Sequence, residues 1–333
     1  MTAQNTDMPV VDAPRINIAE VAEKYALVAA LVVLFGIFAM LLPNTFFTWA
    51  NVSTMLGSQS VLVFLTLALI IPLTSGDFDL SVAATLTISA MTLAVLNARL
   101  GVALPLAMLG AFAVGGIVGV LNAFFILYFR IPSLIVTLGI GTFLNGLTLW
   151  MSNSATIGGI DFALVMGVVG TRLFGIPLAF YYAILMAAVI WYVFGYTSVG
   201  RRLLFVGRGR EVARLSGIQV DRVRFFSLLS SSLIAALAGI LYAGTIGAAD
   251  PNSGNTFLLP AFAAAFLGAT AITPGRFNPV GSVVAVYFIV IGITGLTMLG
   301  IQSFVQNLFY GGALVLAVAL SQLVRKREEQ QVG

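Results

Sequence analysis

Cysteine and histidine are both absent from the 333 residues of the sequence. Their absence excludes thiolate chemistry, disulfide bonds, histidine proton relays and the usual zinc sites. Lysine occurs only as Lys24 and Lys326, and neither follows the glycine-rich turn that a Walker A loop requires. The chain therefore does not hydrolyse ATP by that route, and we expect no catalytic residue, no metal and no cofactor in it.

Charged residues are also scarce, at 8% of the chain, whereas 60% of the residues are hydrophobic. A soluble domain carries about 25% charged residues, so a soluble surface cannot be built from this sequence. A helix needs about 20 apolar residues to cross a bilayer. We predict an all-α, polytopic membrane helix bundle of about ten transmembrane helices. The predicted spans are 25–42, 52–73, 80–97, 103–129, 132–152, 178–195, 224–247, 257–272, 280–299 and 303–323.

The two ends of the chain are polar. Residues 1–24 lack the basic region and the small-residue cleavage site of a secretory signal peptide. We predict an N-terminal tail at 1–24, one transmembrane domain at 25–323 that includes a charged loop at 196–223, and a C-terminal tail at 324–333.

The positions of arginine and lysine between these spans set the orientation. With ten spans and a cytoplasmic N-terminus, 14 of the 16 basic residues are cytoplasmic, and only Arg99 and Arg172 lie outside. Both termini are then cytoplasmic. This asymmetry explains the net charge of +4 without nucleic acid as a partner. The cytoplasmic set is Arg15, Lys24, Arg130, Arg201, Arg202, Arg208, Arg210, Arg214, Arg222, Arg224, Arg276, Arg325, Lys326 and Arg327.

Two short, acidic, glycine-containing loops follow the second and seventh predicted spans, at 75–79 and 249–254. They fall on opposite sides of the membrane, which is typical of an inverted repeat, here of 5+5 spans. Asp77 and Asp79 of the first loop have three open interpretations. They lie in a solvated loop, Asp79 caps the span 80–97, or both belong to a gate or polar path.

The loop 196–223 is the only strongly charged loop. Residues 210–216 are predicted to form a short helix that begins after Gly209 and ends at a left-handed Gly217. Glu211 and Arg214 are three residues apart and share one face. Such a helix suits docking into a groove on another protein, the alternative being an ordinary basic loop. Its expected small and apolar contacts are Ala213, Leu215 and Ile218.

This loop resembles the coupling loop of the permeases of ABC importers, in which a Glu-Ala-Ala motif precedes a glycine. Here Glu211-Val212-Ala213 precedes Gly217, with Val212 in place of the middle alanine and without the hydrophobic-Pro tail of the longer motif. Roughly residues 50–323 are similar to the ribose-type permeases. The matching stretches are Gly200-Arg201-Arg202, Arg214-Leu215-Ser216-Gly217-Ile218, Ser75-Gly76-Asp77-Phe78-Asp79-Leu80-Ser81-Val82, Ile131-Pro132-Ser133-Leu134-Ile135-Val136-Thr137-Leu138-Gly139, and Leu299-Gly300-Ile301 with Gln306.

The resemblance implies a permease in the bacterial inner membrane that passes a monosaccharide or polyol. It also implies three partners: an ABC ATPase subunit, a periplasmic substrate-binding protein and a second permease subunit. The family's Gly-Tyr-Glu-Leu-Asp is replaced at 255–259, which removes two acidic positions, and its Gly-Gly-Thr-Ser-Leu-x-Gly-Gly is altered at 267–275. These departures leave the exact substrate open. The residues expected to couple to the ATPase are Gly207, Arg210, Glu211, Ala213, Arg214, Leu215, Ser216 and Gly217.

Several polar and aromatic side chains fall within or next to the predicted spans. Buried amides and hydroxyls need a partner helix or a water-filled path, and they match a neutral polyhydroxyl substrate. Helix-to-helix hydrogen bonding is the alternative for each of them. The candidates for a substrate path or gate are Asp77, Asp79, Asn122, Thr137, Phe143, Asn145, Phe262 and Gln306.

Other function classes remain open from the sequence. A secondary carrier acting alone is disfavoured because no span carries a lysine, an arginine or an acidic pair at its middle. A permease for branched-chain amino acids or nucleosides in a related importer is a second alternative. A membrane enzyme is disfavoured because no metal-ligand cluster or nucleophile–base constellation is present.

Overall fold

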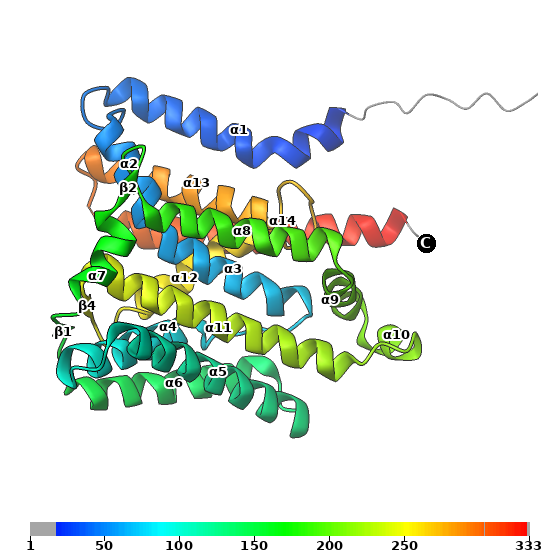
Figure 1. Ribbon diagram of the computed structural model, residues 1–333. Coiled ribbons are helices and arrows are strands. Elements are labelled where there is room, and N and C mark those ends of the chain that lie inside the picture. The colour runs from blue at the N-terminus through cyan, green and yellow to red at the C-terminus, as the bar shows by residue number, and fades with distance from the viewer. Residues whose placement is uncertain (1–17, 303, 332–333) are drawn as a thin grey trace, which may run out of the picture.

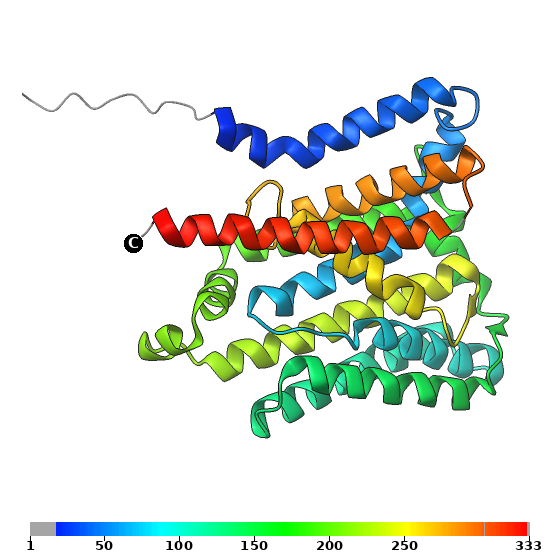
Figure 2. The same ribbon diagram turned by 180° about the vertical axis from the view of Figure 1, so that it is seen from behind.

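The computed structural model describes residues 18–302 and 304–331, and these residues form a bundle of long helices that run side by side (Figure 1, Figure 2). The helices are α1 (Ile18–Leu41), α2 (Trp49–Ser58), α3 (Ser60–Thr74), α4 (Val82–Ala94), α5 (Leu104–Tyr128), α6 (Ser133–Ser152), α7 (Phe162–Val165), α8 (Leu178–Tyr196), α9 (Ser198–Arg208), α10 (Arg210–Leu215), α11 (Val220–Ile246), α12 (Asn255–Gly268), α13 (Pro279–Met298) and α14 (Phe304–Gln331).

Short elements connect some of these helices. The π-helices η1 (Val95–Arg99) and η2 (Met166–Gly170) continue α4 and α7. Strand β1 (Ile157–Gly158) pairs antiparallel with β4 (Ala248–Ala249), and β2 (Arg172–Leu173) forms a hairpin with β3 (Ile176–Pro177). The β1–β4 pair joins the loop after α6 to the loop after α11, at the end of the bundle opposite α9 and α10 (Figure 1).

Eight segments of the described chain are long and apolar enough to cross a membrane, and two shorter apolar helices accompany them. All ten predicted spans therefore correspond to helices, although the two shorter ones differ from a simple span. The eight are Lys24–Leu41, Trp49–Thr74, Val82–Arg99, Leu104–Tyr128, Ser133–Ser152, Leu178–Tyr196, Val220–Ile246 and Pro279–Met298, and the shorter two are Asn255–Gly268 and Phe304–Leu316.

The centre of the bundle is α3, whose residues are all buried, in contact with α11. A helix that is apolar on every side belongs inside a bundle, and α3 shows that pattern. Helix α11 also packs along α4 and α5. Gly115 and Gly119 of α5 face Ala236 and Leu229 of α11 so closely that no side chain fits, and these two glycines therefore allow the helices to pack closely.

Two predicted spans begin or end differently from the prediction. The first residues of the span predicted at 80–97 belong to a non-helical segment, residues 75–81, which runs from the end of α3 to the first residue of α4 (Figure 2). The span predicted at 257–272 is α12, whose 14 residues reach about 21 Å, less than the hydrocarbon thickness of a bilayer. Residues 75–81 and 248–254 thus precede two shortened helices, and the 5+5 repeat stays a prediction.

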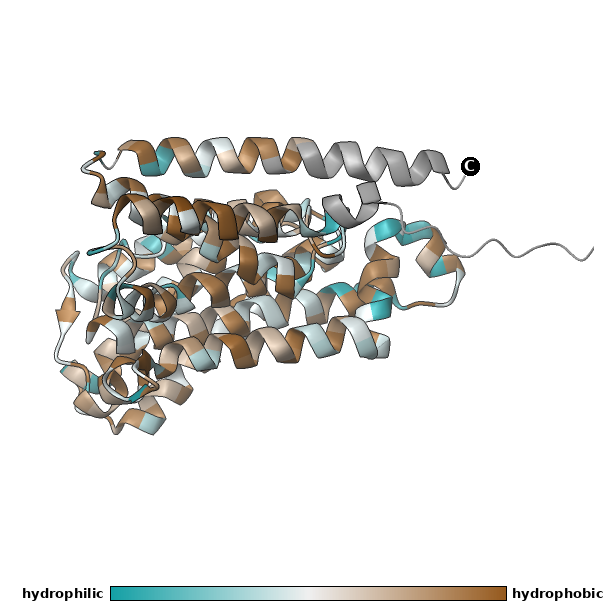
Figure 3. Ribbon diagram, turned by 90° about the horizontal axis from the view of Figure 1, so that it is seen from above, coloured by the Kyte–Doolittle hydropathy of each residue, from teal (hydrophilic) through white to brown (hydrophobic). Residues whose placement is uncertain are grey.

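The start of α1 and the C-terminal end of α14 lie at the same end of the bundle as α9 and α10 (Figure 1). Hydrophilic residues gather at this end, whereas apolar residues follow the lengths of the helices (Figure 3). Arg99 lies at the other end and donates to the carbonyls of Met151 and Ser152. This arrangement agrees with the predicted charge asymmetry, while the side of the membrane on which each end lies stays a prediction.

Helices extend into both predicted tails, whose bounds stay a prediction. Residues 18–24 belong to α1, and 324–331 continue α14, because no proline or glycine interrupts the helix formers there. Residues 1–17 and 332–333 of the predicted tails lie outside the described residues.

Candidate functional site

Helices α9 and α10 form a separate projection between α8 and α11 (Figure 1). Gly209 stands before α10 in an extended conformation, and Gly217 after it has φ +80°. The amide of Ile218 donates to the carbonyl of Ala213 over 3.0 Å, which closes the last turn as helices that end in a left-handed glycine do. The predicted helix and both of its glycine boundaries are confirmed.

The two faces of α10 differ in exposure. Ala213 is buried with Val206 and Val220, and Ile218 packs on the same cluster. Ala213 and Ile218 therefore hold α10 to its own chain. Ala213 is covered by that packing, whereas Ile218 is half-buried, and contact with a partner stays a prediction. The exposed apolar side chains are Leu215, at 88% exposure, and Val212, at 60%.

Polar side chains cover the rest of the exposed surface of α10. Glu211 and Arg214 share a face, as predicted, with 3.4 Å between their charged atoms. Ser216 ends the helix and donates through its hydroxyl to the carbonyl of Val212. The projection therefore presents an apolar pair flanked by charges, a surface that suits docking on another protein.

Asp77 lies directly beneath α10 and is 1% exposed. Both of its carboxylate oxygens accept hydrogen bonds from Arg224 of α11, each over 2.7 Å. Arg210, the first residue of α10, donates to the same carboxylate over 3.0 Å and to the carbonyl of Gly76 over 2.8 Å. The prediction of a solvated loop at Asp77 is wrong, because the two arginines compensate its charge inside the protein.

The backbone around this cluster is packed tightly. Gly207 of α9 contacts the carbonyl of Thr74 at the end of α3, leaving no room for a side chain. Gly76 has φ +80°, which favours glycine, and Ser75 shares a hydrogen bond of 3.0 Å with Ser227 of α11. The end of α9, next to its turn into α10, therefore packs directly against the start of the non-helical segment 75–81.

Asp79 is fully buried two residues further along, and its partners are uncharged. The amide and the hydroxyl of Ser81 donate to one carboxylate oxygen over 3.1 and 2.6 Å, and Ser231 of α11 donates to the other over 3.0 Å. Asn122 of α5 donates to the hydroxyl of Ser81 over 2.7 Å. Ser81, not Asp79, directly precedes α4, and its side chain makes no capping hydrogen bond, so the predicted cap at Asp79 is wrong.

Helix α6 supplies hydrogen-bond acceptors to the non-helical segment 75–81. The amide of Leu80 donates to the hydroxyl of Thr137 and the amide of Phe78 donates to that of Ser133, each over 3.0 Å. These hydroxyls take the place of the helical hydrogen bonds that the two amides lack, and the Leu80 bond is part-buried. Asp79, Asn122 and Thr137, which were predicted separately, thus meet around residues 75–81.

The other predicted path residues do not join this cluster. Phe143 is exposed and Asn145 is half-buried, both on α6, and Gln306 is half-buried on α14. Phe262 of α12 is buried against Phe266 and lines a small depression that also includes Leu80 and Asn255. The depression brings α12, Leu314 of α14 and Leu80 of the segment 75–81 to one place on the surface.

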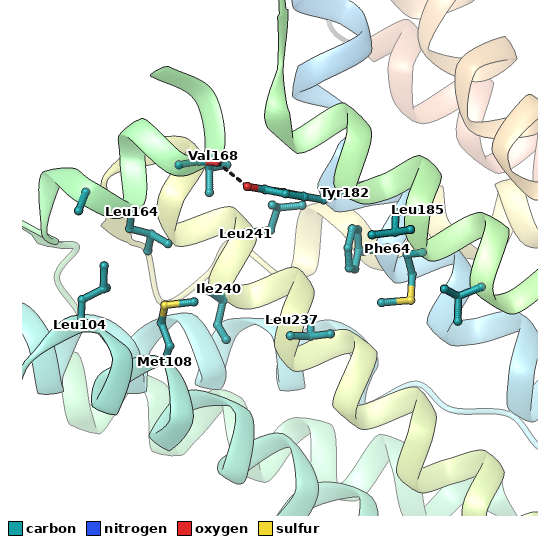
Figure 4. A pocket seen from close by; sticks show the side chains of 14 residues that line it. Phe64, Leu104, Met108, Leu164, Val168, Tyr182, Leu185, Leu237, Ile240 and Leu241 are labelled. Carbon is teal, nitrogen blue, oxygen red and sulfur yellow. Dashed lines mark hydrogen bonds between the residues drawn. The ribbon is translucent and has the colours of Figure 1, made fainter. Parts of the chain in front are cut away.

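Two larger cavities differ in their chemistry. One, of about 520 Å³, is lined mostly by apolar side chains of α3, α5, α7, η2, α8 and α11, and its Tyr182 hydroxyl is turned to the carbonyl of Gly167 (Figure 4). It suits a hydrocarbon chain and offers a sugar few hydrogen bonds. The other, of about 670 Å³, lies beside α10 and includes Asp77, Arg130, Arg210 and Arg224.

Arg224 and Val212 are the functional candidates that sequence reasoning missed. Arg224 stands at the first position of the predicted span 224–247, on the same predicted side as Asp77. A basic residue at a span boundary opposite an unexplained aspartate was the available signal. Nothing in the local sequence distinguishes Val212 from the neighbouring residues of its helix.

The chain was compared with known proteins. The sequence profile described as "Branched-chain amino acid transport system / permease component" matches residues 51–318. The D-allose transport system permease protein AlsC of Escherichia coli (strain K12) is 29% identical over 310 residues, 93% of this chain and 95% of the relative. No solved structure matches the chain.

Two further relatives are similar over most of their length. The ribose import permease protein RbsC of Escherichia coli (strain K12) is 30% identical over 87% of this chain and 90% of the relative. The autoinducer 2 import system permease protein LsrD of Photorhabdus laumondii is 30% identical over 89% of this chain and 90% of the relative. Together with the profile match, these similarities show that the chain belongs to the family of permease components of the branched-chain amino acid transport system type.

Proposed function

We propose that this chain is the membrane permease of an ATP-binding-cassette importer in the bacterial inner membrane, and that it passes a monosaccharide or a related polyol. The names of the relatives, which are permeases for allose, ribose and autoinducer 2, support this substrate class. The projecting helix α10, with Leu215 and Val212 exposed at its surface, is the single observation that carries the ATP-driven part of the proposal.

Three partners complete the proposed machine. A separate ABC ATPase binds α10 and hydrolyses ATP, since this chain has no lysine in a Walker A setting. A periplasmic binding protein delivers the substrate and supplies most of the specificity. A second permease subunit completes the path, and ATP-driven movement of the ATPases switches its opening from one side to the other.

The docking of the ATPase is tested by Leu215→Asp. A carboxylate at the most exposed apolar position of α10 opposes burial in a groove, while Ala213 still holds the helix to the bundle. Leu173→Asp is the matched control, because Leu173 is exposed in β2 at the opposite end of the bundle. We expect the ATPase to co-purify with the control and not with Leu215→Asp. An ATPase that binds both variants equally would contradict the proposal.

Transport assays decide the substrate and the mechanism. Proteoliposomes with permease, ATPase and binding protein are expected to take up one of D-allose, D-ribose or a related polyol, and only with ATP inside. Uptake by the permease alone, driven by an ion gradient, would establish a secondary carrier. Uptake of leucine or valine in preference to sugars would establish the substrate in the family's description.

A further inference from the structure

Arg210 connects the projecting helix to the non-helical segment 75–81, which precedes α4. Its guanidinium donates through one nitrogen to the carboxylate of Asp77 and to the carbonyl of Gly76. Gly207, just before it, packs on Thr74. Helix α10 therefore contacts Gly76 and Asp77 through Arg210, and the adjoining end of α9 contacts Thr74 through the backbone of Gly207.

The two arginines on Asp77 are unequal. Arg224 binds both carboxylate oxygens over 2.7 Å, and its side chain is 13% exposed. Arg210 binds one oxygen over 3.0 Å, and its side chain is 41% exposed. A bidentate, buried arginine is the stronger partner. When α10 moves, Arg210 can leave or pull on Asp77 while Arg224 still compensates the buried charge.

The segment that starts at Asp77 leads within a few residues to the buried Asp79 cluster. Phe78 and Leu80 are bound to α6, Ser81 is bound to Asn122 of α5, and Asp79 is bound to Ser231 of α11. A displacement of Gly76 and Asp77 therefore shifts residues that are hydrogen-bonded to α5, α6 and α11 and that precede α4. It also shifts Leu80, which lines the surface depression with Phe262.

We propose that Asp77 is the residue through which movement of α10 reaches the non-helical segment 75–81, with Arg210 as the coupling contact and Arg224 as the fixed anchor. These are positioning residues, since they act on the segment and touch no substrate. The inference rests on the proposed function, because it needs an ATPase that moves α10.

The first test measures coupling in proteoliposomes that hold the full complex. Arg210→Gln removes the charge pair, and Arg214→Gln is the control on the same helix, where the arginine pairs only with the exposed Glu211. We expect Arg210→Gln to retain bound ATPase and ATP hydrolysis, while the substrate carried per ATP falls about tenfold. Arg214→Gln leaves the contacts of Asp77 in place, so the substrate carried per ATP hydrolysed is expected to equal that of the unmodified protein even if the ATPase binds more weakly. Arg210→Lys keeps one charged donor and is expected to lie between the two.

The second test follows the segment itself and needs no transport. Because the chain has no cysteine, spin labels can be placed by Phe78→Cys or Leu215→Cys, each paired with Tyr128→Cys on α5 as the reference. Both native distances are expected to change when the bound ATPase takes up ATP. With Arg210→Gln, the Leu215 distance still changes and the Phe78 distance does not.

Four outcomes would overturn the inference. One is normal coupling, and another is an unaltered Phe78 response, in Arg210→Gln. Loss of ATPase binding in Arg210→Gln but not in Arg214→Gln would make Arg210 a docking residue, and loss of the folded chain in both Arg210→Gln and Arg210→Lys would make it a structural anchor. An unmodified chain that binds no ATPase would instead refute the proposed function, and the inference with it.

Discussion

Asp77 and Asp79 are two residues apart in the non-helical segment 75–81, and both are buried. They differ in the charge of the side chains that bind them. Asp77 is held by two arginines that come from α10 and α11. Asp79 is held by two serines, one of which is bound by Asn122. Asp77 is a carboxylate paired with arginines at the end of the bundle, where another protein can act. Asp79 is a carboxylate held only by neutral donors among the helices, where charge is costly.

The largest effect is expected for Arg224→Met. The substitution leaves the Asp77 carboxylate buried with only the half-exposed Arg210, so the free energy of unfolding should fall by about 3–5 kcal/mol. Titration of the purified chain with SDS, followed by tryptophan fluorescence, measures this change. Arg224→Met combined with Asp77→Asn should cost less than the sum of the single variants. Additive costs would mean that the two residues do not stabilise one another.

The two aspartates are compared directly by the same substitution. Asp77→Asn leaves Arg224 buried without an opposite charge and should cost about 2–3 kcal/mol. Asp79→Asn keeps an acceptor for Ser81 and gains a donor toward Ser231, so it should cost about 1 kcal/mol. The same SDS titration measures both. If both variants lowered the free energy of unfolding equally, pairing with arginines would not distinguish Asp77 from Asp79, whose partners are neutral.

A smaller effect is expected for Thr137→Val, which preserves the shape of the side chain and removes the acceptor of the Leu80 amide. A buried amide without a partner should cost about 1–2 kcal/mol. Thr142→Val on the same helix is the control, since its exposed hydroxyl bonds only to the carbonyl of Leu138. Equal stability of the two variants would show that the segment 75–81 does not depend on α6.

The smallest effect is expected for Glu211→Gln, which removes the exposed ion pair with Arg214 on the same helix that carries Arg210. Exposed pairs contribute less than about 1 kcal/mol, so the thermal unfolding temperature of the purified chain should barely change. A loss comparable to that of Arg224→Met would show that exposed and buried charges on this end act as one network.

Much of the helix bundle is predictable from the sequence because apolar runs and glycine boundaries are local signals. All ten runs became helices, and Gly209 and Gly217 bound α10 as expected. The non-helical segment 75–81 and the short length of α12 could not be predicted from apolar runs and glycine positions. Hydropathy is the same for an extended and a helical segment, and hydroxyls of α6 replace the missing helical hydrogen bonds.

The candidate site was predicted in parts but not as an assembly. The partners of Asp77 at 224 and of Asp79 at 231 are about 150 residues away, so no local pattern pairs them. Ala213 looked like a contact for another protein because composition does not show which side of a six-residue helix faces its own chain. Phe143 and Gln306 were chosen by residue type, and their places in the fold separate them from the cluster.

The hydroxyls of Ser133 and Thr137 also give the segment 75–81 a property that hydrogen exchange can time. The amides of Phe78 and Leu80 lie outside any helix or strand, yet in deuterium oxide they should exchange as slowly as those of regular secondary structure. A movement that leaves α6 behind must release both amides together. Faster exchange of both amides when the partner ATPase binds ATP would show that the segment moves away from α6 at that step. Unchanged exchange would mean that α6 moves together with the segment.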